Sequence, residues 1–238
     1  MNITSELPQP FHIRAIKKAL RKVTPRVPLI AELGQQFALE SMPFSAQTVL
    51  KGYMNGMFFT LNNSKIHWHA PPQRALMPIN DFHIPKNIKR LINQKKFEVR
   101  FDTSFEKVIK MCAVRESESQ INDDIINVFM QLHEMGIASS VESWQDGELV
   151  GGLYGLKIGS YFSTESQFHT VRDAGKVAFV ALFDVLKSND YLLHDVQFLS
   201  PYLEQFGAIH MPDTDYKNII TQAVIKPAGW ASNPPSSN

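Results

Sequence analysis

The sequence predicts an α+β fold built in two parts. The first half of the chain contains apolar residues at helical spacing as well as short runs in which apolar and polar residues alternate. Two further alternating runs on either side of the turn signal Asp146-Gly147 predict an antiparallel hairpin. One long helical run separates this hairpin from a last short strand, which favours a mixed sheet. Pro71-Pro72 interrupts the patterns. We therefore expect a small N-terminal domain over residues 1–71 and a mixed-sheet domain over residues 72–238.

Composition fits a globular protein without a membrane partner. The chain has 238 residues, of which 44% are hydrophobic and 20% charged, so it can bury a sizeable core. No apolar run has the length of a membrane span, and no hydrophobic signal core opens the sequence. The single cysteine, Cys112, excludes an internal disulfide and is expected to pack on a helix face. We expect a cytoplasmic monomer.

Basic residues are concentrated in two segments although the net charge is only +1. Residues 12–26 and 86–100 each hold six Lys or Arg, which together are half of the 24 in the chain. Such segments favour a polyanionic partner, while solvated helix faces give the same pattern. The first segment also has apolar residues at helical spacing, which predicts a basic amphipathic helix that docks on the body, on RNA or on a membrane surface.

The N-terminal part is expected to form a helix and two short extended segments. Ser45 is a plausible N-cap for a helix over Ala46–Met54, which Asn55-Gly56 would end. Aromatic-rich extended segments follow at residues 57–59 and 66–69. His67 and His69 would share one face there, but no further ligand type completes a set, so no metal is expected.

The second part alternates helices and strands. A basic helix is expected from Pro85 to Asn93, and Thr103 and Glu106 have the spacing of a capping box for a later helix. A Pro/Ser/Asn-rich tail is expected from Trp230 onward. The other expected elements are strands at 97–101, 138–144, 148–154 and 159–164, and helices at 123–135, 173–187, 202–206 and 215–224.

Two polar signatures in apolar surroundings flank the long helix. The first spans Thr164–Phe168 and the second His194–Phe198. A strand, a helix and a second strand can bring both signatures to one end of a sheet. Asp195 and Gln197 are two residues apart, so on a strand they would share a face. We expect this face to be an active site.

The order of elements resembles the N-acetyltransferase (GNAT) superfamily, in which a gap between central strands holds an activated acyl donor. A narrower resemblance rests on sequence blocks in register between about residues 45 and 223. The blocks are Gly52–Phe58, His83–Lys86 with Lys89-Arg90, Phe97–Arg100, Phe105–Ile109 with Cys112-Ala113, Leu132–Gly136, Glu148–Gly155, Glu165-Ser166 with Phe168, Asp195 with Gln197, and Phe206–Ala208. In these blocks the chain resembles the leucyl/phenylalanyl-tRNA–protein transferases.

This resemblance implies an enzyme that moves Leu or Phe from charged tRNA to the α-amine of a protein with N-terminal Lys or Arg, marking it for degradation. No metal or organic cofactor is implied. Asp195 would act electrostatically on the incoming amine, directly or through Gln197, whose amide would orient the amine or the carbonyl. Glu165 would orient the acceptor or the terminal ribose. Replacing Asp195 with Ala is expected to abolish transfer and leave the fold intact.

The resemblance also implies two binding surfaces. Lys86, Lys89 and Arg90 match a basic segment expected to meet phosphates of the tRNA acceptor stem. The implied pocket for the aminoacyl side chain consists of Leu153, Gln167, Phe179, Leu182, Leu186 and His194. Gln167 and His194 depart from the apolar family pattern, so the donor is either Leu or Phe, with both polar side chains satisfied by protein or water, or a more polar residue.

Other departures leave the binding of the terminal adenine open. Phe59, Thr60 and Gln120 stand where family members carry Pro or aromatic residues, and Phe59 or Trp68 could substitute as stacking platforms. Three alternative functions also stay open. They are tRNA-dependent transfer to a small amine or peptide in biosynthesis, a coenzyme-A-dependent N-acetyltransferase with a phosphate loop at Arg172–Val177, and a paralogue that binds tRNA or degron-bearing proteins without transfer.

Overall fold

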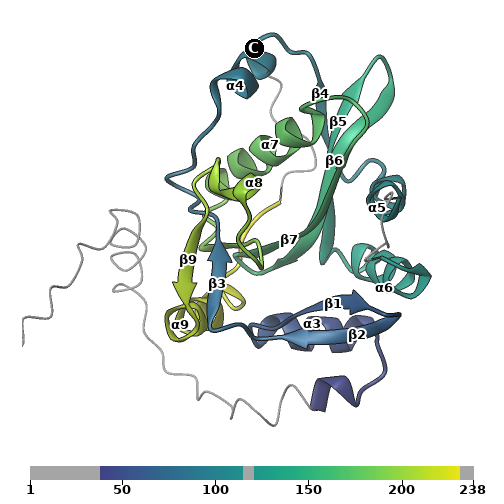
Figure 1. The fold of residues 1–238 in the computed structure, drawn as a ribbon, viewed down its shortest axis with the longest axis vertical. Helices are drawn as coiled ribbons and strands as arrows, with labels where there is room; N and C mark the ends of the chain where they lie inside the picture. The colour runs from purple at the N-terminus through teal and green to yellow at the C-terminus, as the bar shows by residue number, and fades with distance from the viewer. Residues whose placement is uncertain (1–37, 115–120, 231–238) are drawn as a thin grey trace, which may run out of the picture.

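A large mixed sheet stands beside a small helix-and-hairpin unit in the computed structural model, which describes residues 38–114 and 121–230 (Figure 1). The seven-stranded sheet has the order β4-β5-β6-β7-β8-β3-β9. Its strands are β3 (Gln73–Leu76), β4 (Glu98–Phe101), β5 (Ala138–Gln145), β6 (Glu148–Ile158), β7 (Tyr161–His169), β8 (Leu193–Asp195) and β9 (Ile209–Pro212). Strand β8 runs parallel to β7, whereas β4 to β7 form an antiparallel meander. The predicted α+β class with a mixed sheet is confirmed.

Helices cover both faces of this sheet (Figure 1). Helix α7 (Ala174–Ser188) packs on one face, and α5 (Phe105–Ala113) and α6 (Asp123–Glu134) pack on the other. Helix α4 (Lys86–Asn93) lies against α7. Two further helices, α8 (Pro201–Glu204) and α9 (Asp213–Ala223), flank β9 in the sequence. Cys112 is buried in α5, as expected.

The small unit consists of helix α3 (Ala46–Met54) and the hairpin of β1 (Phe58–Asn62) with β2 (Lys65–His69). The predicted N-cap is confirmed, since the side chain of Ser45 accepts a hydrogen bond from the Thr48 backbone at 3.2 Å. Trp68 faces α3 so closely that a side chain at Gly52 would overlap its ring. Such contact fixes the hairpin on the helix.

One hydrophobic core joins the small unit to the sheet. Val49, Tyr53 and Trp68 belong to the same buried cluster as Phe129 of α6 and Tyr154 of β6. Strand β3 begins just after Pro71-Pro72 and enters the large sheet between β8 and β9. The division into domains at residue 71 stays a prediction, because the core is shared across it.

The structure corrects two local expectations. The capping box at Thr103 is wrong: Ser104 occupies the N-cap position without a side-chain bond, and the Thr103 hydroxyl donates to Glu142 instead. Glu142 is fully buried, so its carboxylate needs several hydrogen-bond donors. The Thr103 hydroxyl is one of these donors and is therefore not available to cap the helix. Trp230 does not belong to a tail, since its ring stacks on Phe162 and its Nε1 donates to Asp102 at 2.8 Å.

Strands β3 and β9 were not expected, and β7 extends five residues beyond the predicted end at Thr164. Strand β7 is longer because β6 pairs with it as far as His169. The predicted N-terminal basic helix and the residues after Trp230 lie outside the described ranges.

Candidate active site

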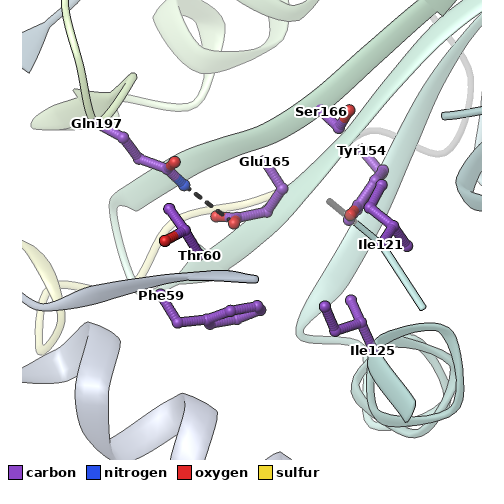
Figure 2. Close-up of a pocket in the computed structure, with 8 residues that line it drawn as sticks. All are labelled: Phe59, Thr60, Ile121, Ile125, Tyr154, Glu165, Ser166 and Gln197. Atoms are coloured by element: carbon purple, nitrogen blue, oxygen red, sulfur yellow. Dashed lines mark hydrogen bonds between the residues drawn. The ribbon is translucent and has the colours of Figure 1, made fainter. Parts of the chain in front are cut away.

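Strands β7 and β8 part at the site. They pair only from Tyr161 to Ser163, and β7 then continues while the chain leaves β8 after Asp195. A β-bulge accompanies this divergence: β6 pairs with Thr164 and Ser166 but skips Glu165. The Glu165 side chain therefore leaves the regular alternation of the strand and points toward Thr60 and Gln197 (Figure 2).

A cavity of about 170 Å³ opens at this point, between β7, the hairpin and α6. Its lining residues come from segments far apart in the sequence (Figure 2). They are Phe59, Thr60, Ile121, Ile125, Tyr154, Glu165, Ser166 and Gln197. Two of the predicted catalytic residues, Glu165 and Gln197, thus share one cavity with both polar and apolar walls.

The Glu165 carboxylate is the ionisable group of this cavity. Its Oε2 accepts hydrogen bonds from Tyr53 Oη at 2.6 Å and from Gln197 Nε2 at 3.0 Å, and its Oε1 accepts from Ser163 Oγ at 2.7 Å. Burial raises the pKa of Glu165 to about 7, although the three donors favour the charged form. Glu165 is therefore suited to exchange protons near neutral pH.

Asp195 lies behind this cavity and is completely buried. Arg74 Nε donates to both carboxylate oxygens at 2.9 Å, and its Nη2 donates to Oδ2 at 2.7 Å. Tyr216 Oη and Tyr161 Oη also donate to Oδ2, at 2.7 Å and 3.0 Å. Burial alone would raise the pKa of Asp195, but Arg74 and these donors hold it below its ordinary value. Asp195 is therefore charged near neutral pH and bonded by three side chains.

The expectation that Asp195 and Gln197 share a strand face is wrong. Strand β8 ends at Asp195, and Gln197 adopts a left-handed backbone with φ of 62°. The turn forms because the Gln197 backbone N–H donates to Asp195 Oδ1 at 2.8 Å. Because the Asp195 carboxylate is completely buried behind this turn, any action on an amine would have to pass through Gln197.

The residues of the implied aminoacyl pocket lie together on the α7 side of the sheet. Leu153, Phe179, Leu182 and Leu186 belong to one buried cluster, and the His194 ring lies 5.8 Å from that of Phe179. Gln167 Nε2 donates to Tyr202 Oη at 2.8 Å, and Tyr202 Oη is 3.1 Å from Gln167 Oε1.

His194 is only partly satisfied. Its Nε2 lies 2.8 Å from Thr164 Oγ1, whereas its Nδ1 has no hydrogen-bond partner among the described residues. Burial lowers the pKa of His194 to about 3, so the ring is neutral. A neutral histidine has one donor and one acceptor nitrogen, so Nδ1 retains one hydrogen-bonding capacity.

The predicted tRNA-binding residues are exposed on α4, whose Ile88 is buried against the body. Lys86, Lys89 and Arg90 therefore face solvent, and α4 lies at the opposite end of the molecule from the β1–β2 hairpin (Figure 1). Trp68 is a wrong candidate for stacking, because it is only 3% exposed beneath the hairpin. Phe59 is buried too but lines the cavity, and Gln120 lies outside the described residues.

Within the described ranges, no group of three His, Cys, Asp or Glu side chains is arranged to hold a metal ion. His69 instead places its Nε2 2.8 Å from Thr60 Oγ1. No helix among residues 38–114 and 121–230 combines the length and apolar character that crossing a membrane requires.

Sequence reasoning missed five residues of the hydrogen-bond network around Glu165 and Asp195, which are Tyr53, Arg74, Tyr161, Ser163 and Tyr216. Arg74 offered a signal, because it opens the apolar run Arg74–Met77 and an arginine in such a strand is rarely buried without an acidic partner. The tyrosines offered none, since aromatic residues at apolar positions fit an ordinary core equally well.

Comparison with known proteins shows the family to which the chain belongs. The family model described as leucyl/phenylalanyl-tRNA protein transferase matches residues 76–221. A protein of that name from Herpetosiphon aurantiacus is 40% identical over 181 residues, covering 76% of this chain and 94% of the relative. Another from Chlorobaculum parvum is 41% identical over 186 residues, covering 76% and 95%.

Among solved structures, that of L-PGS from Bacillus licheniformis is similar with a TM-score of 0.42 and 9% identity, over 71% of this chain and 66% of that one. The alignments with these relatives cover nearly the full length of each relative, and the residues that match the family model include strands β6, β7 and β8. The chain belongs to the leucyl/phenylalanyl-tRNA protein transferase family and is an aminoacyl-tRNA-dependent transferase that acts on proteins.

Proposed function

We propose that the Glu165 cavity is the transfer centre, in which the acceptor α-amine attacks the aminoacyl ester of tRNA. The observation that carries the proposal is the Glu165 carboxylate, held by three donors at the cavity with a pKa of about 7. A protein α-amine has a pKa of about 7.7–8.0, so proton transfer to Glu165 is uphill by roughly 1 kcal/mol. Such matching suits a general base that works near neutral pH.

The proposed step balances without a cofactor. The amine nitrogen forms a bond to the ester carbonyl carbon, and the Glu165 carboxylate takes the proton that the nitrogen loses. The bond from carbon to the ribose oxygen then breaks, and protonated Glu165 returns the proton to that oxygen. The products are an amide-linked protein and free tRNA, with Glu165 ionised again.

Gln197 and Asp195 are positioning residues in this proposal. The Gln197 amide donates to Glu165 Oε2, and its backbone N–H is held by Asp195 at 2.8 Å. Asp195 thus fixes the turn that aims the amide, while Arg74 keeps that carboxylate charged. Positioning of this kind governs rate because reacting groups must meet within a few tenths of an ångström.

We propose that Lys86, Lys89 and Arg90 contact acceptor-stem phosphates, and that the acceptor carries an N-terminal Lys or Arg. The donor side chain would enter the cluster around Phe179, Leu182 and His194 on the α7 side. The Gln167–Tyr202 and His194–Thr164 pairs support transfer of Leu or Phe, since most polar atoms there are already satisfied. The unpartnered His194 Nδ1 supports a donor with a polar atom.

We also propose a cytoplasmic enzyme that acts as a monomer. Charged tRNA is a cytoplasmic substrate, and the buried Cys112 fits a reducing compartment. One chain supplies Tyr53, Ser163, Gln197 and Glu165, which supports a site that is complete without a second copy.

The test is single-turnover transfer of Leu and Phe from charged tRNA to a peptide with N-terminal Arg. Glu165→Gln should lose roughly 100-fold or more in rate, in the range of general-base contributions. Glu148→Gln makes the same chemical change on an exposed β6 carboxylate and should transfer normally. A wild-type rate in Glu165→Gln would refute the assignment. A panel of other charged tRNAs then distinguishes an apolar donor from a polar one.

A further inference from the structure

The chain returns to the large sheet after helix α9. Residues 224–230, which we call the C-terminal strap, lie beyond the residues 76–221 that match the family model. The strap begins where the Ala223 carbonyl accepts hydrogen bonds from the backbone N–H of Ser160 at 2.8 Å and from its Oγ at 3.1 Å. Farther along, Lys226 Nζ donates to the Asp190 carbonyl at 2.5 Å. The strap is therefore fixed to the turn between β6 and β7 and to the residues that follow α7.

Trp230 ends the strap in a well-defined position on the sheet. Its Nε1 donates to Asp102 Oδ2 at 2.8 Å, and its ring stacks on that of Phe162 with 3° between the planes and 5.6 Å between the centroids. The Phe101 ring meets it edge-on at 6.0 Å, and Lys157 Nζ lies 5.7 Å from its centroid. An indole with a bonded N–H and ordered aromatic neighbours is held in one orientation.

Phe162 transmits the position of Trp230 to His194. Phe162 is fully buried, and in the parallel pairing of β7 with β8 its register partner is His194. The two rings meet edge-to-face with 5.7 Å between the centroids. A Cβ at Gly155 would lie 2.6 Å from the Phe162 ring, so this ring lies directly over the β6 backbone. The sheet, Trp230 and His194 thus fix Phe162, and removing Trp230 gives it space to move.

The strap also lies against the end of α7. Gly229 comes so close to Asn189 that a Cβ there would lie 2.4 Å from Asn189 Oδ1. Asn189 is the C-cap of α7, and Leu186 of the implied aminoacyl pocket lies in the last turn of that helix. The strap therefore supports the pocket at two places, at Leu186 through the end of α7 and at His194 through Phe162.

We propose that Trp230 is a positioning residue that sets which donor side chain the enzyme accepts. This inference rests on the proposal that the donor side chain enters the cluster around Phe179, Leu182 and His194. Trp230 packs against the same buried cluster, which contains Phe162, Phe179 and Leu182. Protein cores are close-packed and relax only in part when a large side chain is removed. Without the Trp230 ring, Phe162 and then His194 withdraw from Phe179, and the larger pocket favours Phe over Leu as the donor.

The experiment measures kcat/KM of the full-length enzyme for charged tRNAs carrying Leu or Phe, in competition for one acceptor peptide. Trp230→Ala removes the ring, whereas Trp230→Phe keeps a ring that can stack on Phe162. Trp230→Ala should shift the ratio of Phe to Leu transfer roughly fivefold toward Phe, which is part of the roughly tenfold or more that one methylene in direct contact contributes. Trp230→Phe should stay close to the wild-type ratio, and the KM for acceptor peptide should change in neither variant.

A second variant keeps the test independent of the stability of Trp230→Ala. Phe162→Leu interrupts the same series of rings without changing the strap, and it should shift the ratio in the same direction. Thermal melting shows which variants are folded, and Phe162→Leu with Trp230→Leu decides the matter if Trp230→Ala does not fold. An equal loss of Leu and Phe transfer in the folded variants assigns Trp230 to stability alone and overturns the proposal.

Two controls separate the possible failures. Trp144→Ala makes the same change at a tryptophan whose Nε1 donates to Glu142 at 3.0 Å but which packs against the buried cluster on the other face of the sheet. Its donor ratio should remain that of wild type, and an equal shift there would overturn the role of Trp230. Leu182→Ala enlarges the pocket directly and should shift the ratio further than Trp230→Ala. An unchanged ratio in Leu182→Ala refutes the pocket itself, whereas a shift in Leu182→Ala alone refutes only the role of the strap.

Discussion

Arg74 and Asp195 form an ion pair from which water is excluded, with 1% and 0% of their side chains exposed and 2.7 Å between Nη2 and Oδ2. The pair joins β3 to β8 inside the sheet, and Arg74 Nη1 also donates to the Gly56 carbonyl at 3.1 Å. One guanidinium thus connects the small unit, the sheet and the turn that carries Gln197. Its charge balances a carboxylate that could not otherwise stay ionised there.

Removing either partner should destabilise the fold. Arg74→Leu or Asp195→Ala leaves one buried charge without its partner, which costs about 3–5 kcal/mol of unfolding free energy in urea titrations. This replaces the sequence-based expectation that Asp195→Ala leaves the fold intact. The double variant Arg74→Leu/Asp195→Leu should recover much of that stability but not transfer.

The matched control is Arg100→Leu, which breaks the exposed pair with Glu98 and should cost far less stability than Arg74→Leu, because solvent screens that pair. If Arg74→Leu lost no more unfolding free energy than Arg100→Leu, burial would not be what makes the Arg74–Asp195 pair important for stability.

The direction in which stability changes with pH follows from the lowered pKa of Asp195. Its contribution to stability is present above the ordinary value of 3.8 and is lost as the pH falls through the folded-state value.

Local signals in the sequence were sufficient to predict many helices and strands, but not the hydrogen-bond network around Glu165 and Asp195. Ser45 was recognisable because a cap depends on residues a few positions away. Arg74 bonds Asp195 across 121 positions, and β3 forms only through β8 and β9, so neither has a local pattern. The bulge at Glu165 was likewise hidden, because a skipped residue in one strand is defined by the pairing of the next.

The hydrogen bond from Tyr53 to Glu165 should control the pH dependence of transfer. If Glu165 acts as base, the rate rises as the pH increases through about 7, where the carboxylate ionises. The Tyr53 hydroxyl stabilises the charged form, so Tyr53→Phe should raise this pKa and move the midpoint of the rate profile to higher pH. Single-turnover rates measured from acid to alkaline pH give the midpoint.

Tyr202→Phe is the control for that prediction, since its hydroxyl bonds Gln167 and does not reach Glu165. Its midpoint should remain that of wild type. A Tyr53→Phe midpoint that is unchanged, or shifted to lower pH, would contradict Glu165 as the titrating base.

The exposed cations of α4 should set the salt dependence of tRNA binding. Phosphate contacts release counterions, so replacing Lys86, Lys89 and Arg90 with Gln should reduce the slope of log affinity against log salt by roughly two to three. Filter binding or anisotropy over a salt series measures it. The same number of charges removed at Lys107, Lys110 and Lys187, which are exposed outside α4, should change the slope little. Equal slopes for both triple variants would refute specific contact at α4.

The polar atoms around His194 should determine donor preference. His194→Leu removes the unpartnered Nδ1, and Gln167→Met combined with Tyr202→Phe removes a mutually bonded pair without leaving either group unsatisfied. If the donor is polar, His194→Leu should lower kcat/KM for that donor and raise it for Leu or Phe, each roughly tenfold, because one unpaired polar group costs about 1–3 kcal/mol.

The readout is competition between charged tRNAs for one acceptor peptide, with the Gln167→Met/Tyr202→Phe variant beside it. If wild type already prefers Leu and Phe, and His194→Leu leaves the ratio unchanged, then Nδ1 does not read the donor. In that case the Thr164 contact of His194 serves packing alone, as in an ordinary core with one tolerated polar atom. A ratio that changes only in the Gln167→Met/Tyr202→Phe variant would assign donor recognition to that pair instead.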